Sequence, residues 1–197
     1  AFWVWLRAEY GFSNRQIRKY TFNLAPFLVD EKAIQQGYVT SEPHTIETRG
    51  GFKPQVFLLS DYGYPSYAAM VLARNDLIEN RPEHVQAFVN ATIEGWRSYV
   101  YSDPAPGNRL ILAANPDMTP EIIEQAIEQM RRRAMLQSPD TEAHGIGIMT
   151  RERWQQFFDT MSAHGVYAPS LDWQQAFTMR FVNQTHAAQP VAPPADR

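Results

Sequence analysis

A strand–helix–strand succession near the N-terminus constrains the fold more than any other feature of the chain. Residues 20–22 form a short β-prone run, and residues 24–36 form a helical pattern that Asn23 can cap with its side-chain oxygen. Gly37 ends the helical pattern, and residues 38–41 form a second β-prone run. Because strands joined in this way normally pair in parallel, the chain is predicted to be an α/β protein.

Further β-prone runs and then a long series of helical patterns follow this unit. Residues 55–61 and 68–74 are predicted strands, and Pro82 opens the strongest amphipathic pattern. One face of that pattern has helical spacing and consists of Val85, Phe88, Val89, Thr92, Ile93, Trp96 and Tyr99. Later helices are predicted near 108–114, from Thr119 onward, over 151–163 and over about 171–182. The second half of the chain is therefore expected to be rich in helices.

The composition removes several classes of function. The chain has no cysteine, and its five histidines are too widely spaced to predict a metal site. Its formal net charge is −3, without a basic stripe, which argues against a nucleic-acid partner. The opening AFWVWL is shorter than the roughly 20 apolar residues that cross a bilayer. Without a nucleotide fingerprint or a catalytic set, we expect no cofactor and no enzymatic activity.

A carboxylate follows the second β-prone run. Ser41-Glu42-Pro43 stands where that predicted strand ends, and ligands of open α/β sheets bind outside the carboxyl ends of strands. The Glu42 carboxylate could accept hydrogen bonds from ring N–H or amino groups of a ligand. The alternative is a solvated acid in an ordinary turn, and the residues alone leave both interpretations open.

Three tyrosines lie close together in Asp61-Tyr62-Gly63-Tyr64-Pro65-Ser66-Tyr67, which we call the tyrosine loop (residues 61–67). Proline stiffens such a segment, and tyrosine rings can stack on a planar ligand at low entropic cost. The rings could equally cover the edge of a domain. Asn23 and the helix start behind it offer N–H groups to a ligand, although helix capping alone also explains this residue. The candidate ligand-binding residues are Glu42, Tyr62, Tyr64, Tyr67 and Asn23.

The motifs and their order resemble those of a known family. GYVTSEP (37–43), DYGYPSY (61–67) and ARNDLIENRPEHVQAFVNATIEGW (73–96) are similar to segments of type 2 periplasmic substrate-binding proteins of the NMT1/THI5-like group. That group includes the nitrate, sulfonate, taurine and thiamine-pyrimidine-precursor binding components of ABC importers. The similarity extends over about residues 12–182.

The resemblance implies a two-lobed fold that closes over a small ligand in an interlobe cleft, on which Glu42 and the tyrosine loop would converge. Residues 1–50 would be the later part of the second lobe, as a βαβ unit, and residues 51–185 would return to the first lobe with its helices. Residues 186–197 are predicted to be a disordered tail. The start of the first lobe would be absent, so the fold would be N-terminally incomplete. Its exposed strand edges would then invite a homo-oligomer.

By the same resemblance, the chain would be the periplasmic solute-binding component of an ABC importer. It would pass a small planar nitrogen-containing ligand, such as a thiamine pyrimidine precursor, to a permease in the inner membrane. One alternative is a truncated remnant that oligomerises and binds no ligand. Another is a pyrimidine synthase of the THI5-like branch, which the absence of cysteine disfavours, because that chemistry is associated with a cysteine-rich motif.

Overall fold

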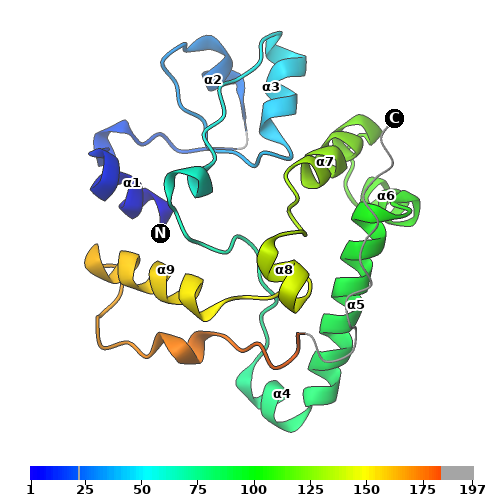
Figure 1. The fold of residues 1–197 in the computed structure, drawn as a ribbon. Coiled ribbons are helices and arrows are strands. Elements are labelled where there is room, and N and C mark those ends of the chain that lie inside the picture. The colour runs from blue at the N-terminus through cyan, green and yellow to red at the C-terminus, as the bar shows by residue number, and fades with distance from the viewer. Residues whose placement is uncertain (22, 183–197) are drawn as a thin grey trace. The chain divides into compact units, whose positions relative to one another are not determined.

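A computed structural model describes residues 1–21 and 23–182, and short helices joined by irregular segments dominate it (Figure 1). The α-helices of these residues are α1 (Phe2–Tyr10), α2 (Ala25–Val29), α3 (Glu42–Gly50), α4 (Asn75–Asn80), α5 (Pro82–Tyr101), α6 (Ala105–Ala114), α7 (Pro120–Arg132), α8 (Pro139–His144) and α9 (Arg151–Ala163). Three short 3₁₀ helices accompany them: η1 (Asn14–Gln16), η2 (Leu59–Tyr62) and η3 (Trp173–Ala176). No described helix is long and apolar enough to cross a membrane.

The predicted α/β class is wrong, because residues 1–21 and 23–182 contain no β-strand. The βαβ unit within residues 1–50, and with it the two-lobed type 2 binding-protein architecture, is therefore not seen. The runs 55–58 and 68–74 have irregular backbone. β-Propensity describes how well side chains fit a paired, half-buried sheet surface, and a strand forms only beside a partner. The composition of these runs indicated β-propensity, but it does not show whether a neighbouring strand is available for pairing.

Pro43 starts a helix where we expected it to stop a strand. Residues 39–41 form a turn in which the Ser41 N–H donates to the Tyr38 carbonyl oxygen over 2.9 Å. Helix α3 then begins at Glu42, and a proline in the first turn of a helix loses no intrahelical hydrogen bond. The residues Ser41-Glu42-Pro43 are compatible with the end of a strand and with the start of a helix. The structure has the helix.

The helix predicted over 24–36 is also much shorter. Helix α2 ends at Val29, and Asp30 starts a turn immediately after it. The Asp30 side chain accepts from the Lys32 N–H over 2.9 Å, and its carbonyl oxygen accepts from the Ala33 N–H over 2.9 Å. Aspartate competes with helical backbone bonds in this way, which explains the early end of the helix. Phe22, part of the first predicted strand, lies outside the described residues.

The helices predicted in the second half of the chain are mostly confirmed. Helix α5 follows Pro82, and α7 begins after Thr119, whose hydroxyl oxygen accepts from the Ile122 N–H over 3.3 Å. Helix α9 matches the range 151–163. The last predicted helix is wrong, because residues 173–176 form only a 3₁₀ turn and the following residues are irregular. The predicted disordered tail, 186–197, lies outside the described residues.

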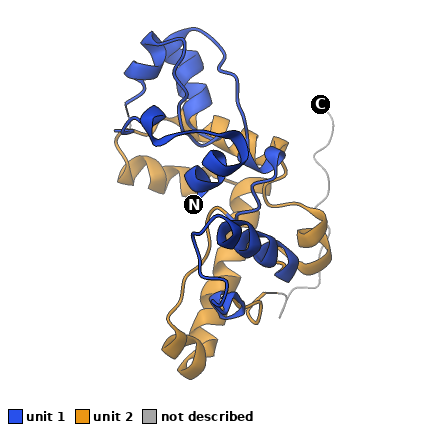
Figure 2. Ribbon diagram, turned by 90° about the vertical axis from the view of Figure 1, so that its left-hand side faces the viewer, with its two compact units in different colours: residues 1–67, 151–176 blue, residues 68–150, 177–197 orange. Residues whose placement is uncertain are grey.

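The chain divides into two compact units (Figure 2). Unit 1 combines Ala1–Tyr67 with Arg151–Ala176, and unit 2 combines Ala68–Thr150 with the residues from Phe177 onward, described to residue 182. The lobe assignments 1–50 and 51–185 refer to a larger fold, and they stay a prediction.

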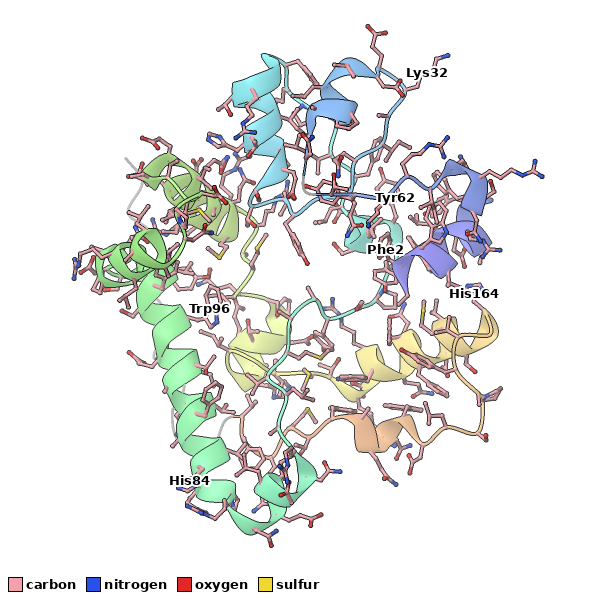
Figure 3. The ribbon with its side chains drawn as sticks, turned by 180° about the vertical axis from the view of Figure 1, so that it is seen from behind. Phe2, Lys32, Tyr62, His84, Trp96 and His164 are labelled. Atoms are coloured by element: carbon pink, nitrogen blue, oxygen red, sulfur yellow. The ribbon has the colours of Figure 1, made fainter. Side chains whose placement is uncertain are left out.

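Unit 1 has its core where α1 packs against α9 and η3 packs on α9 (Figure 1). Trp5 of α1 and Met161 of α9 are buried there. At the end of α9, His164 Nε2 lies 3.4 Å from Glu9 Oε1 of α1, and Figure 3 labels this histidine. Helices α1 and α9, which are far apart in the sequence, therefore depend on each other for burial.

Unit 2 is built around α5, which packs against α4 and α7, while α6 packs on α7. Val100 of α5 is fully buried, and Ile123 and Ile127 of α7 are buried with it in the core of this unit. The Gln86 side chain donates to the Phe181 carbonyl oxygen over 2.8 Å, which ties the last described residues to α5. The amphipathic face predicted for α5 is only partly buried, because Phe88 and Trp96 are exposed.

Candidate ligand-binding site in unit 1

All five predicted ligand-binding residues belong to unit 1: three lie in the tyrosine loop, and the other two lie at or just before the starts of helices. Glu42 and Asn23 lie at the starts of helices, with Glu42 contacting Tyr20 and Tyr38. The tyrosine loop packs against α1 and α9. These contacts place Tyr64 and Tyr67 against α9. None of them joins Glu42 to the tyrosine loop. Convergence of Glu42 and the tyrosine loop on one ligand stays a prediction.

The Glu42 carboxylate is held by two donors of its own chain. Oε2 accepts from the Tyr38 N–H over 2.7 Å, and Oε1 accepts from the Tyr20 hydroxyl over 3.2 Å. Burial and the adjacent Glu42 charge raise the pKa of Tyr20 above 10.0. As the first residue of α3, Glu42 also places its charge at the favourable end of the helix dipole.

Gly37 is part of this arrangement. A Cβ atom at position 37 would lie 2.7 Å from the Cβ of Glu42, so only glycine lets the chain pass this close to the carboxylate. The geometry gives Glu42 a structural role in closing the turn before α3. Each carboxylate oxygen has a second lone pair, so a ligand N–H could still be accepted at this position.

The side chain of Asn23 closes the start of α2. Its Oδ1 accepts from the Ala25 N–H over 3.0 Å, which is a local turn preceding a helix of five residues. The N-cap residue of α2 is Leu24, which makes no side-chain cap hydrogen bond, so Asn23 forms a turn before the helix instead of the predicted cap. A contact between Asn23 and a ligand stays a prediction.

The tyrosine loop is held firmly at its beginning. Gly63 adopts a left-handed conformation with φ 92°, which turns the chain away from η2. The Gly63 N–H donates to the Ser60 carbonyl oxygen over 3.2 Å, and the Tyr64 N–H donates to that of Leu59 over 3.1 Å. Pro65, which follows, is buried. The loop therefore has a defined conformation, although its residues 64–67 lie outside regular secondary structure.

Tyr64 is part of the core of unit 1. Its ring centroid lies 5.2 Å from that of Trp5 and 6.2 Å from that of Phe157, the latter in an edge-to-face arrangement. Burial raises the pKa of the Tyr64 hydroxyl. The ring is thus held between α1 and α9, and its contribution to a ligand site would be to support its neighbours.

Tyr67 lies against two residues of α9. The guanidinium carbon of Arg153 lies 4.3 Å from the centre of the Tyr67 ring, and the ring of Trp154 is 6.3 Å away. A cation over the face of a tyrosine ring is attracted by the ring quadrupole. The Arg153 guanidinium and the Tyr67 ring thus restrain each other.

Tyr62, labelled in Figure 3, is the tyrosine of the loop with an exposed side chain. It is 49% exposed, and its ring centroid lies 6.1 Å from that of Phe57, which is 62% exposed. The two rings form an exposed aromatic pair in unit 1. Sequence reasoning missed Phe57, because it was assigned to a strand; its position in an apolar run just before the tyrosine loop was the available signal.

Other features of the described residues offer no competing site. No group of three or more His, Asp or Glu residues in 1–21 and 23–182 could hold a metal ion. An open depression in unit 2 is lined by consecutive residues, Leu72 to Asp76, so it is a bend of one segment rather than a built site. Within unit 1, Phe57 and Tyr62 thus form an exposed aromatic pair at the start of the tyrosine loop.

Comparison with known proteins identifies the class to which this chain belongs. Residues 6–106 match the family model described as NMT1/THI5 like, and the chain is a member of that family. The match includes Glu42, the tyrosine loop and α5, so the family resemblance found in the sequence is confirmed. No solved structure matches the chain.

One curated relative is the riboflavin-binding protein RibY of Chloroflexus aurantiacus. The two sequences are 26% identical over 172 residues, which cover 80% of this chain and 44% of the relative. The chain therefore spans less than half the length of that protein.

Proposed function

We propose that this chain is a non-enzymatic solute-binding protein that takes a small planar nitrogen-containing ligand on unit 1. The exposed aromatic pair of Phe57 and Tyr62 supports this most directly. Tyr62 belongs to the tyrosine loop, which packs on α9. Both residues lie within the part of the chain that matches the family model. Solvent-exposed aromatic rings on a fixed loop gain apolar contact when a flat ligand covers them.

The ligand class follows from the chemistry around the aromatic pair and from the relative. Riboflavin is a flat, nitrogen-rich heterocycle, and a thiamine pyrimidine precursor is a smaller molecule of the same kind. Stacking on Tyr62 would hold either ring system, and a carboxylate such as that of Glu42 accepts from ring N–H or amino groups. Sulfonate or nitrate would call for basic or N–H-rich contacts, whereas a carboxylate beside tyrosines favours a neutral or cationic heterocycle.

The expected partner is an ABC permease in the inner membrane, to which a periplasmic solute-binding protein passes its ligand. Support for this partner and for the compartment comes from the family alone.

A second candidate is a form that self-associates and binds no ligand. It is favoured by the exposed apolar run Met70, Val71 and Leu72 in unit 2. The third interpretation, a pyrimidine synthase, has no support from the residues, since the chain has no cysteine.

A titration with riboflavin, and in parallel with the free thiamine pyrimidine, tests the proposed function. Stacking on aromatic rings quenches flavin fluorescence, so we expect saturable quenching by the parent protein. Phe57→Ala and Tyr62→Ala should each weaken binding, by about tenfold if stacking of one ring is worth roughly 1.4 kcal/mol.

Phe88→Ala is the matched control, because Phe88 of α5 is 61% exposed and lies in unit 2. It should leave the affinity unchanged. A parent protein that binds neither compound, or a Phe88→Ala variant as weakened as Phe57→Ala, would contradict the proposed site.

A further inference from the structure

We propose that Arg153 is a positioning residue for the ligand site: it holds the tyrosine loop on α9 so that Tyr62 faces solvent in one orientation. The inference rests on the ligand-binding role proposed above. Arg153 lies near the start of α9, far from the loop in sequence and outside the part of the chain that matches the family model. Sequence reasoning gave no role to this residue.

Three interactions connect the Arg153 guanidinium to three consecutive residues. Its Nε donates to the Pro65 carbonyl oxygen over 3.0 Å, and a terminal nitrogen donates to that of Ser66 over 2.9 Å. The same group lies over the ring of Tyr67 at 4.3 Å. All these residues belong to unit 1, and the two hydrogen bonds are partly buried.

The hydrogen bonds reach a part of the loop that has no helix to hold it. Residues 64–67 lie outside regular secondary structure, and Pro65 has no N–H with which to form a backbone hydrogen bond. The loop start is fixed at Gly63 by η2, whereas its end is fixed by Arg153. Because Tyr62 lies just before the turn at Gly63, restraint at both ends limits the directions that its ring can take.

Only arginine combines these interactions at one position. The planar guanidinium presents several N–H donors in a fixed fork and can stack its face on a ring at the same time. A lysine ammonium keeps the charge, but it is a compact group that cannot reach two carbonyl oxygens in this geometry while covering the Tyr67 ring. The substitution Arg153→Lys therefore separates the fork geometry from the charge.

The helix provides a matched control two residues away. Arg151 is also on α9, and its guanidinium carbon lies 5.6 Å from the centre of the Trp173 ring. It thus shares the charge, the helix and a cation–ring contact with Arg153, while its aromatic partner lies after α9 instead of in the tyrosine loop. The substitution Arg151→Lys changes the same kind of residue at a position whose ring contact is with Trp173, whereas the carbonyl hydrogen bonds to the loop come from Arg153.

Hydrogen exchange of the full chain, together with riboflavin titration, tests the inference. For Arg153→Lys and Arg153→Ala we expect faster amide exchange at Tyr64, Ser66 and Tyr67 and weaker riboflavin binding. If the loop spends only a tenth of its time in the binding orientation, the apparent Kd rises about tenfold. Arg151→Lys should change neither quantity.

The readouts separate the inference from the proposed function. Unchanged exchange of the loop amides in Arg153→Lys, or equal acceleration in Arg151→Lys, would overturn the positioning role. Unchanged riboflavin affinity despite faster loop exchange would also overturn it. If the parent protein binds neither riboflavin nor the pyrimidine, the proposed function fails, and exchange alone then decides whether Arg153 holds the loop. If Arg153→Ala does not fold, the test rests on comparing Arg153→Lys with Arg151→Lys and the parent protein.

Discussion

Glu42 shows how a single carboxylate can look like a ligand group and yet be occupied by its own chain. Its two oxygens accept from the Tyr38 N–H and from the Tyr20 hydroxyl, and Gly37 passes close to its side chain. The residue that we placed at the end of a strand instead closes a turn and opens a helix. Any ligand at this position would share an acceptor that the fold already uses.

The substitution Glu42→Gln should therefore weaken folding before it affects any ligand. The substitution replaces one carboxylate oxygen by an NH₂ group, which cannot accept the hydrogen bond donated by the Tyr38 N–H or the Tyr20 hydroxyl. We expect the free energy of unfolding to fall by roughly 1 to 2 kcal/mol, the range for a weakened hydrogen bond to a charged, partly exposed acceptor. The pKa of Tyr20 should also fall toward 10.0, since the adjacent negative charge is lost.

Urea unfolding measures the first effect, and tyrosinate absorbance against pH measures the second. Glu47→Gln is the control, because Glu47 lies in the exposed last part of the same helix. Equal stability of the Glu42→Gln protein and its parent would show that the two hydrogen bonds contribute nothing.

At the scale of secondary structure, helices with local start signals could be predicted and strands could not. Thr119 and Pro120 define the beginning of α7 within a few residues, and Pro82 does the same for α5. A strand depends on a partner elsewhere in the chain, which no local pattern reveals. In the candidate site, the tyrosine loop was predictable from composition, whereas the separate roles of Tyr62, Tyr64 and Tyr67 follow only from packing against α1 and α9.

Two glycines in unit 2 give opposite predictions for one substitution. Gly95 of α5 has open space where a Cβ atom would stand, so Gly95→Ala should stabilise the protein by about 0.5 to 1 kcal/mol through helix propensity. Gly107 of α6 is different, because a Cβ atom there would lie 2.8 Å from the Tyr99 ring. That ring is anchored by a 2.8 Å hydrogen bond from its hydroxyl to Asn108 Oδ1.

For Gly107→Ala the overpacking cost of about 1 to 3 kcal/mol exceeds the gain in helix propensity, so we expect net destabilisation. Urea unfolding of the two variants beside the parent decides the matter. Stabilisation of both proteins by the same amount would mean that the Tyr99 ring moves aside freely.

At the scale of the whole molecule, the exposed apolar run in unit 2 predicts self-association. Leu72 is 96% exposed in a segment of irregular backbone, between the neighbouring exposed side chains and α4. Contiguous exposed apolar residues mark contact surfaces, and unpaired β-prone segments pair readily with other chains. We expect Leu72→Lys to lower the oligomer fraction in sedimentation velocity.

Leu110→Lys serves as the comparison, because Leu110 of α6 is 72% exposed and is helical. If both substitutions lower the oligomer fraction equally, self-association depends on exposed apolar area in general and not on the run that contains Leu72. A parent protein that is monomeric throughout would remove this surface from consideration.

The division of unit 1 into two stretches of sequence has a consequence for biosynthesis. Residues Ala1–Tyr67 leave the ribosome well before α9, which covers Trp5 and Tyr64 and emerges only after all of Ala68–Thr150 has been made. Unit 2 relies mainly on contacts between helices close in sequence, which form quickly, whereas unit 1 must wait to close a long loop. The nascent chain therefore carries uncovered aromatic surface while Ala68–Thr150 is being made, the state in which chaperones capture a polypeptide.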